Sequence, residues 1–331
     1  MTGRQVPDVG TVRAVVESAA RAPSLHNSQP WRWRWDGTTA DLHVDAERLL
    51  PATDMFNREG VLGCGVVLQH AEVAWAAAGW HTRTSLFPEP TVRAHVAAVE
   101  PVEPRPPTAA QRCLAAAIGR RYTDRMPMDA PPEWLTTSQV LTFLAHRFGT
   151  TATFLDADQV TELRRISALT TRVRRYDPRY QDELRWWTAG PEHGAAGVPS
   201  TALPGCAEVP LNREFPVGTL DADPAAGGAD DAAAVAVLST TGDSAVDLLD
   251  CGRALSAVLL DCTQAGLSTG TVTHVVELPS ARLLVSELVG QRFPQVLVRI
   301  GGARTPAPPR TPRRPVDSML ELTAGPQVAA E

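Results

Sequence analysis

Apolar residues along the chain repeat first with the period of a helix and then with the period of a strand. Before Pro23, the side chains that share one helix face are Val12, Val15, Val16, Ala19 and Ala20. Pro23 ends this predicted helix, because its ring disfavours helical geometry at the preceding residue and it has no N–H to donate. Trp and Arg then alternate over residues 31–35, which predicts a half-buried strand with Trp on one face. A short polar loop therefore lies between a helix end and a strand.

The same two periodicities assign most of the remaining chain. Further strands are predicted at residues 41–45, 82–87, 92–99, 151–155, 235–239 and 296–300. Further helices are predicted at residues 61–79, 133–148, 160–175 and 248–266, with another that begins at residue 108. The Pro-rich residues 100–107 predict a stiff linker. Residues 176–231 lose this pattern and are rich in Gly, Ala and Pro, which is typical of a functional lid or a disordered segment.

Two of these helices are similar to each other. Residues 64–79 and 251–266 align without a gap, since each begins with Cys-Gly, ends with Ala-Gly and leads to a strand. Internal duplication of a helix–strand unit predicts two pseudo-equivalent halves that pack as one globule. Chance similarity between two Ala-rich helices is the competing interpretation.

Composition narrows the class of protein. The 331 residues are 44% apolar and carry a formal net charge of -6, which argues against nucleic acid or an anionic membrane as the main partner. The chain contains no Lys, which excludes Schiff-base and P-loop lysine chemistry. The N-terminal residues lack an apolar signal region, so we expect a cytoplasmic protein. Five cysteines and eight histidines show no metal-ligand spacing, so we expect reduced thiols and no metal site.

Two polar stretches are candidates for chemistry. The loop Pro-Ser-Leu-His-Asn-Ser-Gln-Pro-Trp at 23–31 has short side chains that can hydrogen-bond a planar polar ligand, although Asn and Ser also cap ordinary connectors. Arg-Tyr-Thr-Asp-Arg at 121–125 places two guanidinium groups around a hydroxyl, an arrangement that binds phosphate when it is not a solvated helix end. Thr-Pro-Arg-Arg-Pro at 311–315 either adds guanidinium groups to the same anion or forms a basic disordered tail.

Together these stretches resemble FMN-dependent nitroreductases. Residues 23–31 are similar to the P-S-x-x-N-x-Q-P-W loop of that superfamily, and residues 121–125 look like its R-x-[S/T]-x-[R/K] phosphate motif. Residues 252–267 resemble its central helix, and residues 312–315 resemble its C-terminal basic clamp. The order of these motifs, with His26 in the loop, looks most like the Acg-type branch.

The resemblance implies an α+β fold, a nitroreductase-like three-layer α/β/α sandwich. The two pseudo-equivalent halves, 1–104 and 105–331, would form an intramolecular pseudo-dimer. The second half would include a lid insertion at about residues 176–231 and a C-terminal arm at about residues 303–331. Because the first half has the loop and the second half has the phosphate motif, one complete FMN site per chain follows, with the reciprocal site degenerate. The monomer would act as a pseudo-dimer, and further association of chains stays open.

The resemblance also implies roles for single residues. Those assigned to FMN binding are Pro23, Ser24, Leu25, Asn27, Arg121, Thr123, Arg125, Val275, Glu277, Arg313 and Arg314. The loop residues would line the ring, the 121–125 segment would bind the phosphate and ribityl chain, and Arg313 and Arg314 would close over the phosphate. Backbone N–H groups of residues 272–277 would face the flavin. No catalytic side chain is assigned, because the flavin carries out the hydride chemistry.

The implied activity is an oxidoreductase that passes hydride from NAD(P)H through FMN to an unknown acceptor. A long lid over the ring gives the alternative, a protein that sequesters FMN with little or no turnover. A flavin-free scaffold is a remote third interpretation.

Overall fold

The computed structural model describes residues 5–188, 196–203, 209, 211, 213–215 and 231–323. Its helices are α1 (Val9–Ala19), α2 (Arg58–Ala77), α3 (Ala109–Arg120), α4 (Trp134–His146), α5 (Ala157–Arg175), α6 (Pro178–Thr188), α7 (Ala245–Gln264), α8 (His274–Glu277) and α9 (Pro279–Val289). Its strands are β1 (Trp31–Trp35), β2 (Ala40–Val44), β3 (Trp80–Leu86), β4 (His95–Pro104), β5 (Met128–Asp129), β6 (Thr150–Phe154), β7 (Ala234–Thr240), β8 (Ser268–Val272), β9 (Phe293–Ala303) and β10 (Leu320–Leu322). The expected α+β class is confirmed.

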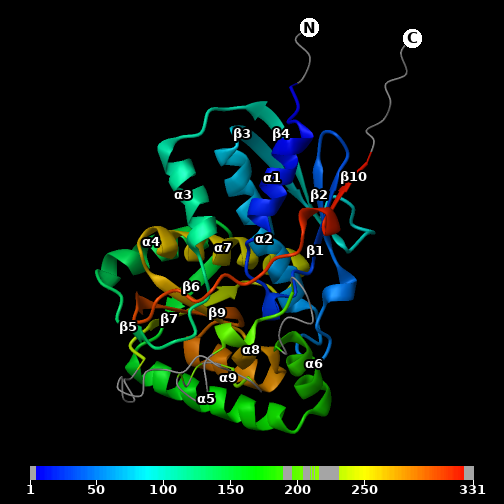
Figure 1. Cartoon of the computed structure of the whole chain (residues 1–331). Helices are drawn as coiled ribbons and strands as arrows, with labels where there is room; N and C mark the ends of the chain where they lie inside the picture. Colours follow the sequence, from blue (N-terminus) through cyan, green and yellow to red (C-terminus); the bar gives the residue numbers. More distant parts are fainter. Residues whose placement is uncertain are drawn as a thin grey trace, which may run out of the picture.

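The first sheet has the strand order β10-β1-β2-β4-β3 and packs on α1 and α2 (Figure 1). Burial along β1 alternates as the Trp/Arg pattern predicts, with the Trp side chains inward and the Arg side chains outward. The edge strand β10 comes from the C-terminal arm and pairs in parallel with β1, Trp33 lying opposite Leu320. Residues from the C-terminal arm therefore complete the sheet that β1 begins.

The second sheet has the order β5-β9-β7-β6, with β8 also paired to β9, and both of its faces are buried. Leu238 on β7 and Val298 on β9 share the core of α2, α7 and the first sheet. Val237 on β7 and Leu297 on β9, whose side chains project to the opposite face, pack with apolar residues of α5 and α9. Helices thus cover both sides of this sheet and make a three-layer α/β/α arrangement (Figure 1).

Helices α2 and α7 cross between the two sheets (Figure 1). A Cβ atom on Gly65 would lie 2.0 Å from the carbonyl oxygen of Leu249, and a Cβ on Gly252 would lie 2.0 Å from that of Leu62. These contacts are reciprocal in the two segments whose sequences align. Such a crossing fits two pseudo-equivalent halves related by an approximate two-fold axis, which stays a prediction.

By length and composition α2 could cross a membrane, but 78% of its most apolar window is buried within the described structure. Its apolar surface is therefore taken up by the protein core.

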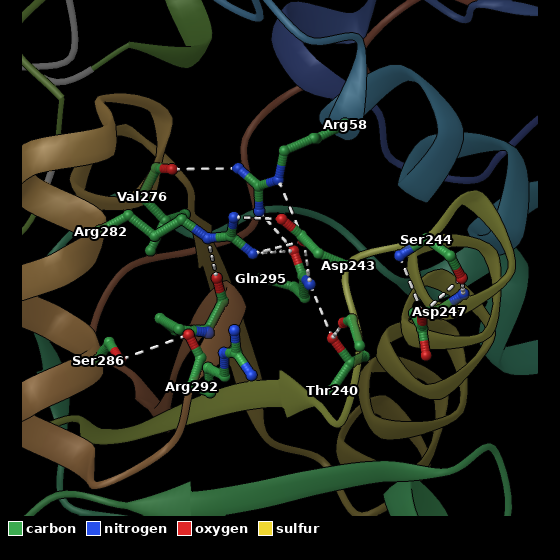
Figure 2. A network of polar contacts seen from close by, with 12 residues as sticks. Arg58, Thr240, Asp243, Ser244, Asp247, Val276, Arg282, Ser286, Arg292 and Gln295 are labelled. Atoms are coloured by element: carbon green, nitrogen blue, oxygen red, sulfur yellow. Dashed lines mark hydrogen bonds and ion pairs between the residues drawn. The ribbon is translucent and has the colours of Figure 1, made fainter.

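A polar network ties the first turn of α2 to the second sheet (Figure 2). Arg58 donates to the Val276 carbonyl at 3.1 Å and to the side chain of Gln295. Gln295 in turn donates to Asp243 at 2.9 Å, and Asp243 forms a bidentate pair with Arg282 at 2.7 and 2.8 Å. The Arg282 hydrogen bonds lower the pKa of Asp243 to about 2. This network fixes α2 against the connection between β8 and α9.

Two sequence expectations differ from the structure. Residues 100–104 belong to β4 rather than to a linker, and Pro101 and Pro104 pair only with β3, beyond the part of β4 that β2 covers. Proline is tolerated there because it has no N–H to donate, and this part of β4 pairs with a neighbouring strand on one side only. Within 176–231, Pro178–Thr188 forms α6, whose Pro at the first helical position and buried Tyr180 and Leu184 are favourable for a helix. Residues 189–195, 204–208, 210, 212 and 216–230 of that segment lie outside the described residues.

Removing the close approach of α2 and α7 is expected to destabilise the fold. Gly252→Ala places a methyl group against a backbone carbonyl, so the helices must separate, and the free energy of unfolding should fall by at least about 2 kcal/mol in urea titrations. Gly119→Ala on α3 is the matched control, because nothing lies within 4 Å of its Cβ position. It should leave stability unchanged or raise it by up to about 1 kcal/mol. Equal stability of both variants would contradict a tight crossing.

Candidate functional site

The loop between α1 and β1 is held in a left-handed conformation by its own side chains. The backbone φ angles of His26, Asn27 and Gln29 are 49°, 56° and 53°, values that residues other than glycine rarely adopt. Ser24 Oγ accepts from the Gln29 N–H at 2.9 Å, and the fully buried Gln29 amide donates to the Asn27 carbonyl at 3.2 Å. Ser24 and Gln29 therefore fix the loop, as the connector interpretation predicts.

The same loop nevertheless borders two adjoining cavities. The first, here called the inner cavity, has about 840 Å³ of empty space, part of it open to solvent, and lies among the loop, α2, β8 and α7. The second, here called the arginine cavity, has about 1010 Å³ of empty space, part of it also open to solvent, and lies among the loop, the end of α3 and residues 307–313. The two cavities adjoin, because Pro23, Ser24, Thr123 and Arg125 line both of them. Leu25 lines the inner cavity, whereas Asn27 and Arg121 line the arginine cavity.

Positive charge dominates the arginine cavity. Its described lining includes no carboxylate, and its guanidinium groups belong to Arg21, Arg120, Arg121, Arg125, Arg310 and Arg313. Burial, together with the neighbouring Arg21 and Arg125, lowers the pKa of Arg121 to about 10. Burial and the same kind of repulsion lower the pKa of Arg313 to about 9. Like charges buried together without a counter-charge are unfavourable, so this cavity favours an anion.

The arginines of this cavity differ in the partners that they have among the described residues. The Nε atom of Arg121 is buried and has no hydrogen-bond partner among them. Arg125 donates to the Ala202 carbonyl at 3.3 Å. Arg313 donates to the carbonyls of residues 20, 21 and 22, where it compensates the C-terminal end of α1. Arg121 is therefore better placed than Arg313 to bind an anion.

Three of the residues assigned to the cofactor lie elsewhere. Arg314 is not among the described residues that line either cavity, because it donates instead to the Gln29 and Trp31 carbonyls and pairs with Asp45. Val275 and Glu277 do not line the cavities either. Val275 is in the core, and Glu277 forms a buried ion pair with Arg213. From the 272–277 stretch, the inner cavity is bordered by residues 272–274.

An acidic side chain lies inside the inner cavity. Glu59 shares one face of α2 with Leu62, Gly63 and Val66, which also line this cavity. Burial raises the pKa of Glu59 to about 8, and its Oε1 atom has no partner among the described residues. Two basic side chains beside it are neutral, since burial lowers the pKa of His26 well below its usual value and that of His274 to about 3. The cavity therefore holds a protonated carboxyl group near neutral pH.

Some described residues of the 176–231 segment border the two cavities. Phe215 lies edge-on to His26, with ring centroids 6.2 Å apart, and the Arg125 guanidinium lies 5.9 Å from the Phe215 ring. Arg213, which also lines the inner cavity, forms an ion pair with Glu277 and donates to the Tyr180 hydroxyl. Across the loop, Asn27 donates to the Gly197 carbonyl at 2.9 Å. These contacts place the described residues 196–203 and 213–215, here called the lid, beside the cavities.

Comparison with known proteins gives the chain its family. No protein-family model matches it. "Putative NAD(P)H nitroreductase acg" of Mycobacterium tuberculosis is 43% identical over 321 residues, which cover 95% of this chain and 96% of the relative. The chain belongs to the Acg family of nitroreductase-like proteins. A second relative from the same organism, "Putative NAD(P)H nitroreductase Rv3131", is 37% identical over 95% of this chain and 92% of its own length.

A solved nitroreductase with bound FMN from Desulfitobacterium hafniense matches this Acg-family chain with a TM-score of 0.39 and 15% identity, covering 60% of this chain and 94% of that structure. The two whole-chain relatives confirm the resemblance to this family that the sequence motifs indicated.

Sequence reasoning missed several residues of this Acg-family site. In the sequence, Glu59 is an ordinary acidic residue at the start of an apolar helix. Its helical spacing from Leu62 and Val66, which places it on their face, is the signal that it faces the inner cavity. Arg21 follows the last turn of a predicted helix, where basic residues are common. Arg213 and Phe215 stand in a segment without periodicity, so nothing local marks them.

Burial of Glu59 should make the free energy of unfolding depend on pH. An unfolded Glu is ionised above its ordinary pKa of 4.5, whereas folded Glu59 keeps its proton up to about pH 8. Folding therefore takes up a proton, and stability should fall as pH rises from about 6.5 to about 8, by up to about 1.4 kcal/mol per pH unit. The buried histidines act in the opposite sense, but only below about pH 6.5.

Urea unfolding of the flavin-free protein across this pH range measures the slope. Glu59→Gln, which cannot ionise, should flatten it. A slope of equal size in Glu59→Gln would assign the proton uptake to another group.

Proposed function

We propose that this chain is an FMN-dependent oxidoreductase of nitroreductase type, which accepts hydride from NAD(P)H and passes it to a small-molecule acceptor. One observation carries this proposal. The loop of residues 23–27 and the arginines of residues 121–125, which the sequence motifs assign to opposite ends of a flavin, border the same two adjoining cavities. Bound FMN would supply the hydride chemistry, and the protein would supply binding and electrostatics.

The arginine cavity fits the phosphate of FMN. A phosphate dianion would neutralise the mutual repulsion of Arg121, Arg125 and Arg21 and would accept from the unpartnered Nε of Arg121. Thr123 borders both cavities and would bind the polar chain that joins the phosphate to the ring. Three guanidinium groups that otherwise destabilise each other would then stabilise the complex.

The inner cavity fits a flat ring system. Pro23, Leu25 and Leu62 supply apolar contact surface, whereas residues 270–274 of β8 and its following turn supply backbone polar groups. Glu59 adds a protonated carboxyl group that can donate a hydrogen bond to a polar edge of the ring. The apolar and polar groups that line the inner cavity would therefore suit a ring with apolar faces and polar edges.

Arg125→Ala tests the phosphate end. Removing this guanidinium should weaken FMN binding by about 1.5–3 kcal/mol, roughly ten- to a hundredfold, because a charge-assisted hydrogen bond to the phosphate is lost. Fluorescence titration of flavin-free protein with FMN measures the change. Arg112→Ala on the preceding helix α3 is the control, since Arg112 donates to the Pro107 carbonyl and lines neither cavity. Equal affinities of the two variants would show that the phosphate binds elsewhere.

Reduction of the flavin tests the activity. Purified yellow protein should lose its flavin absorbance when NADH or NADPH is added without oxygen, and an electron acceptor should restore it. A yellow protein that neither donor bleaches would reject the oxidoreductase proposal.

The lid supports a second candidate function, sequestration of FMN without turnover. Arg213 and Phe215 occupy the cavity wall opposite α2, and the lid carbonyl of Ala202 accepts from Arg125. In that case bleaching should be slow in the native chain and faster in Phe215→Ala, which opens the cover over His26. Unchanged reduction in Phe215→Ala would count against a closed lid.

A further inference from the structure

A cluster of metal-ligand side chains lies on the first sheet, away from both cavities. Asp41 and His43 are two residues apart on β2, so their side chains share one face. This is the outer face, because their partners on β1 are the outward Arg34 and Arg32. An irregularity in the pairing of β2 with β4 brings His95 directly opposite His43. Three potential ligands thus meet on the solvent side of the sheet.

The side chains converge closely. One potential ligand atom from each of Asp41, His43 and His95 lies within 4.8 Å of the others. Nε2 of His95 lies 3.1 Å from Asp41 Oδ1, near the separation of about 3.3 Å between two ligands of a tetrahedral zinc ion with bonds of about 2.0–2.2 Å. The His43 and His95 rings are stacked, with centroids 4.4 Å apart.

A second carboxylate orients the central ligand. Nδ1 of the buried His95 lies 3.1 Å from Glu89 Oε1, which leaves Nε2 directed at Asp41. Histidines that bind metals commonly donate their other ring N–H to a carboxylate, which fixes the tautomer and makes the ligand nitrogen more basic. Glu89 on one ring nitrogen of His95 and Asp41 facing the other reproduce this arrangement, and neither Glu89 nor Asp41 lines the cavities of the proposed flavin site.

We propose that Asp41, His43 and His95 bind a divalent first-row transition-metal ion, with Glu89 as the residue that positions His95. Two imidazoles and one carboxylate suit Zn²⁺, Ni²⁺ or Cu²⁺ rather than Mg²⁺ or Ca²⁺, which prefer oxygen ligands. Three protein ligands leave one coordination position for water or for a group on another molecule. The site is independent of the proposed oxidoreductase activity.

Neighbouring charges set the affinity. Arg32 is already paired with Asp45 at 2.9 Å and Glu47 at 3.0 Å, so its charge is largely compensated. Arg34 lies opposite Asp41 in the register of β1 and β2 and opposes a cation. Replacing Arg34 should therefore strengthen metal binding rather than weaken it.

Calorimetric titration of the tag-free, full-length protein with Zn²⁺ tests the site. We expect one bound ion, with affinity reduced more than about a hundredfold in His43→Ala and about ten- to a hundredfold in Glu89→Gln. His43 is the decisive position because it is half-buried and pairs with no carboxylate among the described residues, so its replacement spares the fold. Arg34→Gln should bind more tightly than the native chain.

His81→Ala is the matched control, since His81 is an exposed histidine on β3 of the same sheet. It should bind Zn²⁺ like the native chain. Heat of binding that survives in His43→Ala, or that disappears in His81→Ala, would overturn the assignment, as would a native chain that binds no Zn²⁺. Flavin content, measured by absorbance, should be the same in every variant.

Discussion

The close crossing of α2 and α7 is the contact on which the rest of the structure depends. Two glycines let the helix backbones approach until Cα atoms of Gly65 and Gly252 are near contact, which no side chain would permit. One turn beyond the glycines, Ser256 on α7 hydrogen-bonds the side chains of Gln69 and His70 on α2. Polar contacts therefore join the two helices next to the close glycine contact. Since both sheets pack on this helix pair, its geometry sets the distance between them. The face of α2 that leads to Glu59 and the face of α7 that carries Leu255 then become two walls of the inner cavity.

The arginine cavity shows the opposite kind of constraint, one that the chain leaves unsatisfied. Burial of a charge is unfavourable unless it is paired, and here burial and mutual repulsion lower the pKa of Arg121 and Arg313 without a carboxylate among the described lining residues. Arg313 is partly compensated by the carbonyls at the end of α1, but Arg121 keeps an unpartnered donor. The repulsion among these arginines lowers the free energy of unfolding of the anion-free protein, and a bound anion would restore it. The affinity for the anion and the lower stability without it therefore have the same electrostatic origin.

Local pattern predicted the parts of the fold that depend on local physics. The strand of residues 31–35 follows from alternation alone, and the helix pair follows from helical spacing and its terminal glycines. Pattern also placed the loop and residues 121–125 in one site, because their motifs resemble those of a known family. It could not find the partners of Arg314, which lie some 285 positions away at Gln29, or the pairing of Arg213 with Glu277. Such contacts depend on tertiary packing, which leaves no period in the sequence.

The lid and the carboxylates of the inner cavity form one electrostatic unit. Glu277 raises the pKa of both Glu59 and Asp54, whereas Arg213 opposes that effect at Glu59. Arg213 reaches this group from the lid, and Glu277 is buried beneath it. Withdrawing the guanidinium would leave the buried Glu277 without its ion pair, beside the carboxyl groups of Glu59 and Asp54. The position of Arg213 and the electrostatics of the inner cavity are therefore linked.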